Sequence, residues 1–310
     1  MPGIVITVTC LNPALDITYE VDGVDWSGVN RPGQVRVRPG GKGLNVARTL
    51  LAIGAQTRLL GLAGGATGAD VTSALADLGV PATFTPTGGE TRRTFAVVDT
   101  GRGHTALFNE PGPEVTEDEY ATFVTAYEKA LADSAAVVLS GSLPRGLPAG
   151  AYAGLVAAAT AAGVPAVLDT HGEALALGAA AGPAIVKPNL AELEAWSGGA
   201  GAVPAAAAGL RAAGPEAVVV SLGPDGLLAV TAEGAWRAAP PGEVAGNPTG
   251  AGDAVTAGLV HGLVLGRPWP DRLRHAVALG TAAVASPVAG EFSLADYARV
   301  LTEVTVEASP

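Results

Sequence analysis

The segment GNPTGAGDAVTAG, residues 246–258, places one carboxylate directly after a run of small residues. Gly250, Ala251 and Gly252 carry nothing larger than a methyl group, so a ligand can approach their backbone closely. A helix that begins near Asp253 would direct its unpaired N–H groups and the positive end of its dipole into this loop, which favours the binding of an anion. An acidic N-cap after a glycine turn is the simpler alternative.

A carboxylate beside an anion site suits the transfer of a phosphoryl group to a hydroxyl. A purely structural anion site would avoid the acid, because two negative charges repel each other. During phosphoryl transfer, backbone N–H groups stabilise the charge of the moving group while a base removes the proton of the acceptor hydroxyl. We therefore predict that Asp253 is the catalytic base and that the backbone of residues 250–253 forms the anion hole.

Other phosphate and metal motifs are absent from the sequence. There is no Walker A motif, because the lysine of GGKGLN (40–45) is followed by glycine. No G-x-G-x-x-G follows the first β-rich run, which argues against a dinucleotide-binding site. His104, His261 and His275 lack the spacing to cysteines or acids that zinc requires, so we expect no zinc site.

Several segments resemble the motifs of the PfkB, or ribokinase-like, carbohydrate kinases. PGGKGLNVARTLLAIGA (39–55) resembles the N-terminal signature of that family, and residues 246–258 resemble its C-terminal signature. Within the family, TCLNPALDITYEV (9–21), SGSLPRGLP (140–148) and VKPNLAELE (186–194) resemble the branch of 1-phosphofructokinases and tagatose-6-phosphate kinases. The resemblance implies a ribokinase-like α/β fold of three layers, α/β/α, with a doubly wound, mostly parallel sheet and a small β-sheet lid.

The resemblance assigns the sugar site to Asp16 and to the GGKGLN segment. Asp16 would accept hydrogen bonds from two neighbouring sugar hydroxyls, which suits the two oxygens of a carboxylate; a turn-capping role after Asn-Pro is the alternative. Gly40 and Gly41 would let the sugar reach the backbone, and Asn45 would supply a donor and an acceptor. Lys42, in the same turn, could meet a substrate phosphate or a sugar oxygen.

A phosphorylated substrate needs cations, and the candidates are Lys42, Arg31, Arg92 and Arg93. The guanidinium fork of arginine binds phosphate oxygens at two points. By position, Arg92 resembles the arginine with which this branch binds the substrate phosphate, and Arg31 is the second candidate; for each, a solvated surface arginine is the alternative. Branch members tend to read T-R-I-N where this chain has TRRT (91–94), so the phosphate position that the site recognises stays open.

The resemblance places the nucleotide at VKPNLAELE, where it implies roles for Lys187, Asn189 and Glu192. Asn189 and Glu192 are three residues apart on one helical face and would order Mg²⁺ through water against the phosphates of ATP. A capping box formed by the same pair is the alternative. His171 stands where the branch usually has serine, and it either faces the nucleotide or is simply exposed. Further nucleotide contacts are expected from Ser221, Gly223 and Gly226.

Short β-rich runs alternate with Ala/Leu-rich helical segments along the chain. The β-rich runs are continuously apolar, which is typical of strands covered by helices on both faces. They are residues 4–11, 57–64, 135–143, 165–170, 184–189 and 217–223. The predicted helices are 43–53, 67–78, 116–132, 149–162, 190–196, 203–213, 252–265, 271–285 and 293–304. This order predicts a doubly wound, mostly parallel sheet in a single α/β domain, residues 1–310.

Two segments, 16–38 and 91–109, alternate apolar and polar residues and contain hairpin-like glycines. They predict antiparallel strands with one wet face, either as edge hairpins or as a small sheet that covers the ligand crevice as a lid. Because the exposed face of such a sheet needs a cover, we expect a homodimer that packs lid against lid.

The composition excludes several classes of protein. The 310 residues carry a net charge of −11, with 48% hydrophobic and 15% charged residues, which supports a large core and argues against nucleic-acid binding. The N-terminus lacks a signal-peptide pattern, and no run of about 18 apolar residues predicts a membrane span. Cys10 is the single cysteine, so no internal disulfide can form and we expect a reducing, cytoplasmic location.

Together these features predict a MgATP-dependent kinase of a phosphorylated ketohexose. Fructose 1-phosphate, giving fructose 1,6-bisphosphate, is the first candidate substrate; tagatose 6-phosphate, fructose 6-phosphate and a free hexose are the alternatives. A non-catalytic sugar-binding protein on a kinase fold belongs to another functional class. The presence of both Asp253 and the glycine loop argues against that alternative.

Overall fold

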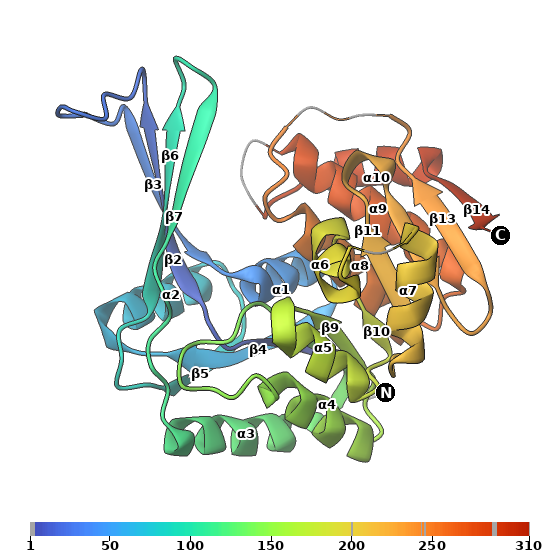
Figure 1. Ribbon diagram of the computed structural model, residues 1–310. Helices are drawn as coiled ribbons and strands as arrows, with labels where there is room; N and C mark the ends of the chain where they lie inside the picture. The colour runs from blue at the N-terminus through green and yellow to red at the C-terminus, as the bar shows by residue number, and fades with distance from the viewer. Residues whose placement is uncertain (1–3, 200, 243, 245, 287–289, 310) are drawn as a thin grey trace.

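The computed structural model describes residues 4–199, 201–242, 244, 246–286 and 290–309. Within them, ten strands form one large sheet, sheet A, and four strands form a smaller one, sheet B (Figure 1). The strands of sheet A lie in the order β14 (Thr305–Ser309), β13 (Ala235–Ala239), β12 (Leu227–Val230), β11 (Ala217–Ser221), β10 (Ile185–Val186), β9 (Ala166–Asp169), β8 (Ser134–Ser140), β1 (Val5–Cys10), β4 (Gln56–Ala63) and β5 (Ala82–Pro86).

Sheet A is parallel from β11 to β5, as the continuous apolar runs predict. These runs are buried because helices cover both faces; residues 136–139 of β8, for example, are 0% exposed. The strands β12, β13 and β14 extend the sheet in antiparallel fashion. These three strands and the edge strand β5 were not predicted from the sequence, because they are short and lack a long apolar run.

Helices flank sheet A in two layers, which confirms the predicted three-layer fold. One hydrophobic core joins the sheet to α1 (Lys42–Ala52), α2 (Gly65–Asp77), α8 (Ala251–Val264), α9 (Trp269–Ala285) and α10 (Leu294–Glu303). The other core joins it to α3 (Glu117–Leu131), α4 (Ala151–Ala161), α5 (Gly172–Ala180), α6 (Leu190–Ser197) and α7 (Val203–Ala212). Of these helices only α5 was not predicted. In the described residues no helix is both long and apolar enough to cross a membrane.

Sheet B projects from the body of the molecule (Figure 1) and has the order β3 (Gln34–Gly40), β2 (Ala14–Val21), β6 (Arg92–Asp99) and β7 (His104–Asn109). These strands fall in the two segments with alternating polarity. The prediction of antiparallel strands holds for the pairs β2–β3 and β6–β7 but is wrong for the central pair, since β2 and β6 are parallel. The reason is topological: β2 follows β1 and β6 follows β5, so both strands leave the same edge of sheet A and run outward together.

The carboxyl ends of the parallel strands meet at this same edge of sheet A. Ser140 at the end of β8 pairs with Asp169 at the end of β9, and Leu168 pairs with Val186 at the end of β10. Ligands of doubly wound proteins bind at this edge. The fold therefore brings together the strand ends, the base of sheet B and the N-terminus of α8.

Candidate active site

The N-terminus of α8 has the geometry that an anion site requires. Gly250 is the N-cap with φ of 86°, a left-handed conformation that favours glycine, and no described side chain caps the helix there. Ala251 N–H donates to the carbonyl of Pro248 at 3.2 Å, whereas the N–H groups of Gly252 and Asp253 have no hydrogen-bond partner among the described residues. Two N–H groups at the positive end of the helix dipole are thus free for a ligand.

Asp253 lies in the first turn of α8, so the alternative of an acidic N-cap does not hold. The residue is 6% exposed, and its carboxylate accepts a hydrogen bond from Asn45 Nδ2 at 2.8 Å. Burial, followed by the negative charge of Asp169, raises the pKa of Asp253 to about 7. A carboxylate with such a pKa can take a proton from a hydroxyl at neutral pH and release it afterwards.

Asp169, at the end of β9, is the centre of a buried charge network that the sequence analysis missed. Its fully buried carboxylate lies 3.0 Å from Lys42 Nζ and 3.2 Å from Lys187 Nζ, and it accepts a hydrogen bond from Thr256 at 2.8 Å. Burial opposes ionisation, but the charges of Lys187 and Lys42 outweigh it and hold the pKa of Asp169 below its usual value. The carboxylate therefore joins α1, the segment after β10 and α8.

The two lysines bring positive charge to the edge where the anion site lies. Lys187 is 3% exposed, and a Cβ on Gly252 would lie only 3.7 Å from its ammonium nitrogen. Lys42 is closer to the surface, and its Nζ also lies 3.6 Å from Glu192 Oε1. Burial favours the neutral amine of Lys42, but Asp169 and Glu192 outweigh it and raise its pKa. Lys42 is therefore held as a cation, and Lys187 lies beside the N–H groups of α8.

Asn189 and Glu192 form the capping box that the sequence offered as the alternative to a magnesium site. Asn189 Oδ1 accepts the N–H of Glu192 and Glu192 Oε2 accepts the N–H of Asn189, both at 2.8 Å. The second oxygen of Glu192, Oε1, faces Lys42. Among the described residues, no group of three or more His, Cys, Asp or Glu side chains is placed to hold a metal ion. A metal at this position would need phosphate oxygens and water as its further ligands.

Asp16 lies on β2, at the base of sheet B. It is held by a hydrogen bond that Thr94 Oγ1 donates to its Oδ1. Burial raises the pKa of Asp16, although Thr94 and the charges of Arg92 and Arg48 lower it. Gly40, on the neighbouring strand β3, lies against this side chain, and any Cβ at position 40 would overlap the Asp16 carboxylate. Position 40 of the N-terminal signature therefore has to be glycine, because any side chain there would displace the Asp16 carboxylate.

The two arginines of TRRT have different surroundings. Arg92 Nε donates to the carbonyl of Asn12 at 3.3 Å, and its charge acts on Asp16. Arg93 instead forms two hydrogen bonds with Glu110, at 3.0 and 3.3 Å, and stacks over a neighbouring phenyl ring. Only Arg92 of this pair is therefore beside the predicted sugar site.

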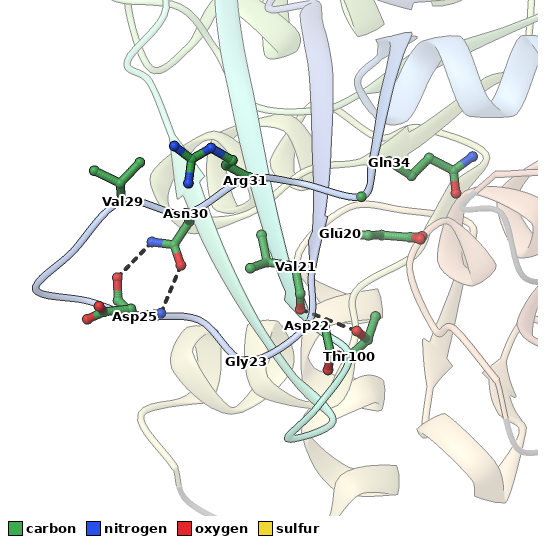
Figure 2. Close-up of a pocket in the computed structure, with 11 residues that line it drawn as sticks. Glu20, Val21, Asp22, Gly23, Asp25, Val29, Asn30, Arg31, Gln34 and Thr100 are labelled. Atoms are coloured by element: carbon green, nitrogen blue, oxygen red, sulfur yellow. Dashed lines mark hydrogen bonds between the residues drawn. The ribbon is translucent and has the colours of Figure 1, made fainter.

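Arg31 lies at the outer end of sheet B, away from Asp16. It borders an open cleft of about 550 Å³ between β2, β3 and the segment that joins them (Figure 2). Asn30 closes this segment by hydrogen bonds to the backbone of Asp25 at 2.7 and 2.8 Å. Since Glu20, which also lines the cleft, is four residues beyond Asp16 along β2, Arg31 is separated from the sugar site by about 13 Å of strand.

The remaining residues that were predicted to contact the nucleotide lie at the end of β11, in the turn that follows it, or at the N-cap of α5. Ser221, at the end of β11, is joined to Asn189 by a β-bridge. Gly223 and Gly226 have φ of 63° and 82°, and a Cβ on Gly226 would overlap the backbone of β13, so a turn alone accounts for that glycine. His171 is exposed at the N-cap of α5.

Two buried polar atoms, one just after β1 and one at the end of β8, lack partners among the described residues, and neither was predicted from the sequence. Among the buried side chains that the structure describes, Asn12 Oδ1 and Ser140 Oγ form no hydrogen bond. The amide nitrogen of Asn12 donates to Ser142 Oγ at 3.1 Å. Buried polar atoms are normally paired, so these two are available to a ligand. Their motifs, LNPALD and SGSLP, were visible in the sequence, but no single residue in them was marked out by charge.

Several known proteins are similar to this chain in sequence and in fold. It is 38% identical to a 1-phosphofructokinase of Xanthomonas campestris over 267 residues, which are 84% of each chain. Two structures of phosphofructokinase-2 from Escherichia coli share 30% identity over 97% of this chain and 99% of theirs; the one in complex with potassium gives a TM-score of 0.90, and the one in complex with fructose 6-phosphate gives 0.87. A sequence model of the pfkB family of carbohydrate kinases matches residues 10–295. The chain therefore belongs to the pfkB family of carbohydrate kinases.

Proposed function

We propose that this kinase transfers the terminal phosphoryl group of ATP to fructose 1-phosphate and so produces fructose 1,6-bisphosphate. The observation that carries the chemistry is the buried Asp253 beside two free N–H groups at the N-terminus of α8. The similarity to a 1-phosphofructokinase over 84% of the chain supports this choice of acceptor.

In the proposed mechanism Asp253 removes the proton of the acceptor hydroxyl. The hydroxyl oxygen then forms a bond to the terminal phosphorus of ATP, and the bond from that phosphorus to the oxygen of the departing ADP breaks. The hydrogen bond from Asn45 reaches only Oδ2 of Asp253, which leaves the other carboxylate oxygen to accept the proton. The near-neutral pKa of Asp253 suits this transfer.

The charge on the moving phosphoryl group is stabilised by the backbone and by the lysines. The N–H groups of Gly252 and Asp253 point to where charge develops, and Lys187 lies beside Gly252. Lys42 adds a second cation, since its Nζ pairs with both Asp169 and Glu192. These groups are fixed by buried contacts before the reaction, so little reorganisation is needed.

Asn189 and Glu192, which follow β10, are suited to hold a magnesium ion that keeps most of its water. Glu192 Oε1 is the carboxylate oxygen not used by the capping box, and Asn189 lies beside it. Mg²⁺ commonly binds through one or two carboxylates together with substrate phosphates and water. Bound with ATP, the ion would neutralise phosphate charge, and Glu192 with Asn189 would hold its waters.

For the sugar, we infer that Asp16 binds two adjacent hydroxyls and that Arg92 binds the phosphate. Asp16 has one carboxylate oxygen next to Thr94, and the absence of a side chain at Gly40 leaves room for the other oxygen. The charge of Arg92 acts on this acid, and its Nε donates to the backbone carbonyl of Asn12, the residue whose side-chain Oδ1 has no partner among the described residues. An arginine is suited to phosphate because its nitrogens match two phosphate oxygens.

Sheet B would act as a lid that excludes water, and a second copy of the chain would cover its outer face. Paired positions on that face carry the apolar side chains Val37, Ile17, Phe95 and Phe108, one from each strand. Val37 and Phe108 are at least half exposed in the single chain. A row of this kind favours a symmetric homodimer. Arg31 then keeps its predicted role only if the dimer brings it to a sugar site, since the single chain does not.

The choice of acceptor is tested with a panel of sugars under saturating ATP. We expect the highest kcat/KM with fructose 1-phosphate, lower values with fructose 6-phosphate and tagatose 6-phosphate, and the lowest with free fructose. Fructose 6-phosphate is the strongest competing acceptor, because the Escherichia coli relative binds it. A higher kcat/KM with either 6-phosphate would replace the proposed substrate, and binding of sugar without any ATP turnover would favour the non-catalytic alternative.

A further inference from the structure

Three charged side chains from distant parts of the chain meet where sheet B joins the body. Arg38 lies near the end of β3, Arg48 lies on α1, and Glu291 lies between α9 and α10. One oxygen of Glu291, Oε1, accepts a hydrogen bond from Arg48 Nη2 at 3.0 Å and another from Arg38 Nη1. A single carboxylate therefore ties a strand of sheet B to a helix of the body.

Both arginines are next to the sugar site. Arg38 is the direct partner of Asp16 in the register of β2 and β3, and paired residues project from the same face of a sheet. Arg48 follows Asn45 by three residues on α1, which places both on one side of the helix, and its charge acts on Asp16. Directly before the carboxylate, Gly290 packs on α1: a Cβ there would lie 2.6 Å from Asn45 Oδ1.

The carboxylate of Glu291 separates two positive charges that would otherwise repel each other. Burial lowers the pKa of Arg48, Glu291 raises it, and the charge of Arg38 lowers it again. Arg48 is largely buried and cannot turn away into solvent, whereas Arg38 and Glu291 are more than a third exposed. Exposed ion pairs add little to global stability. Loss of the Glu291 carboxylate would instead act locally, because the repulsion between Arg38 and Arg48 would push β3 away from α1.

We propose that Glu291 is a positioning residue that holds the base of sheet B against α1, so that Asp16 stays in place for the sugar. This proposal rests on the kinase function proposed above. It assigns no contact between Glu291 and the substrate. The carboxylate acts through Arg38, which shares a sheet face with Asp16, and through Arg48, which shares a helix face with Asn45.

The test compares Glu291→Gln, which removes the charge at nearly constant shape, with Glu303→Gln as the matched control. Glu303 on α10 is exposed to a similar extent and also pairs with an arginine, at 3.5 Å. Hydrogen exchange of the full-length protein without ligand reports the opening of sheet B directly. In Glu291→Gln, amides of β2 and β3 should exchange about tenfold faster than in the wild type, and those of sheet A should not change.

Kinetics supply a second readout with the sugar that the wild type phosphorylates. Glu291→Gln should raise the KM for this sugar about tenfold and change the KM for ATP less than about twofold. Arg38→Gln breaks the same Arg38–Glu291 pair but leaves no second arginine facing Arg48, so it should raise this KM less than Glu291→Gln does. The double variant should show no larger rise than Glu291→Gln alone, because the Arg38–Glu291 pair is already lost in that single variant. Glu291→Asp should restore part of the loss.

Unchanged exchange in β2 and β3, equal acceleration by Glu303→Gln, or equal rises in both KM values would each overturn the positioning role. Failure of the proposed function gives a different result. If the wild type phosphorylates no sugar phosphate, that function is wrong, while the exchange experiment still decides the role of Glu291 because it needs no substrate.

Discussion

Replacing Asp169 by asparagine tests how the site keeps Asp253 usable as a base. Asp169 contacts Lys42 at 3.0 Å and Lys187 at 3.2 Å, and its charge is the second cause, after burial, of the raised pKa of Asp253. In Asp169→Asn this negative charge is lost and both lysines act on Asp253 without their counter-ion. Both changes favour the ionised form of Asp253, so its pKa must fall.

The size of the effect follows from the pKa of about 7 for Asp253. A base loses activity tenfold per pH unit below its pKa, so about a tenth of Asp253 is ionised in the wild type at pH 6. Removal of one nearby like charge should lower the pKa by on the order of one to two units, which leaves about half to nine-tenths of Asp253 ionised at pH 6 in the variant. The ratio of variant to wild-type kcat/KM should therefore rise about five- to tenfold between pH 8 and pH 6.

The assay measures kcat/KM for the sugar from pH 5.5 to pH 9 under saturating ATP. Because loss of one partner from a buried ion pair destabilises a protein by about 3–5 kcal/mol, the assays are run well below the melting temperature of the variant. Asp133→Asn, which removes a partner of Arg58 on the surface, is the control. It should leave unchanged the acid limb of the profile, which is the pH range in which kcat/KM falls as Asp253 becomes protonated. An acid limb that stays near pH 7 in Asp169→Asn, or moves to higher pH, would refute the electrostatic coupling.

Three other variants probe single contacts. Asp253→Asn should lower kcat by about 10²- to 10⁴-fold, as for loss of a general base, and near-normal turnover would exclude that role. In thermal unfolding the same variant should gain stability at pH 8 but not near pH 4, because the buried carboxylate destabilises the fold only when ionised and its pKa is raised from 3.8 to about 7. Arg92→Ala should raise the KM for a sugar phosphate about tenfold but not that for a free hexose, whereas Arg93→Ala, which removes a side chain paired elsewhere, should change neither. Gly40→Ala should prevent sugar binding in calorimetric titration, since its methyl group would overlap Asp16; unchanged affinity would place the sugar elsewhere.

The parts of this site that could be predicted from sequence are those encoded in short segments. The run 250–253 predicts a helix N-terminus with an acid because the glycines and the aspartate are neighbours in the chain. The apolar runs predict the parallel strands in the same way, and the carboxyl ends of these strands then meet at one edge. Even the alternative for Asn189 and Glu192, a capping box, depends only on a spacing of three residues, and it is present.

The parts that could not be predicted depend on pairings between distant residues. Asp169 lies 127 residues from Lys42, and nothing in its local sequence distinguishes it from an acid at the end of any strand. The parallel pairing of β2 with β6 likewise depends on where β1 and β5 lie in sheet A, which local alternation does not contain. The position of Arg31 could not be predicted for the same reason. An arginine is suited to bind phosphate, but the length of β2 places Arg31 far from Asp16.

The buried charges of the site explain why Asp253 can be a base although two lysines are close by. A lysine paired directly with Asp253 would hold its pKa low and leave it a poor proton acceptor. Here Asp169 takes both ammonium groups, at 3.0 and 3.2 Å, and Asp253 receives only the neutral amide of Asn45. The lysines are thus paired with Asp169 beside the anion site, while the base keeps its proton affinity. Two buried acids side by side are unfavourable for folding, and their opposite pKa shifts are what separates the structural acid from the catalytic one.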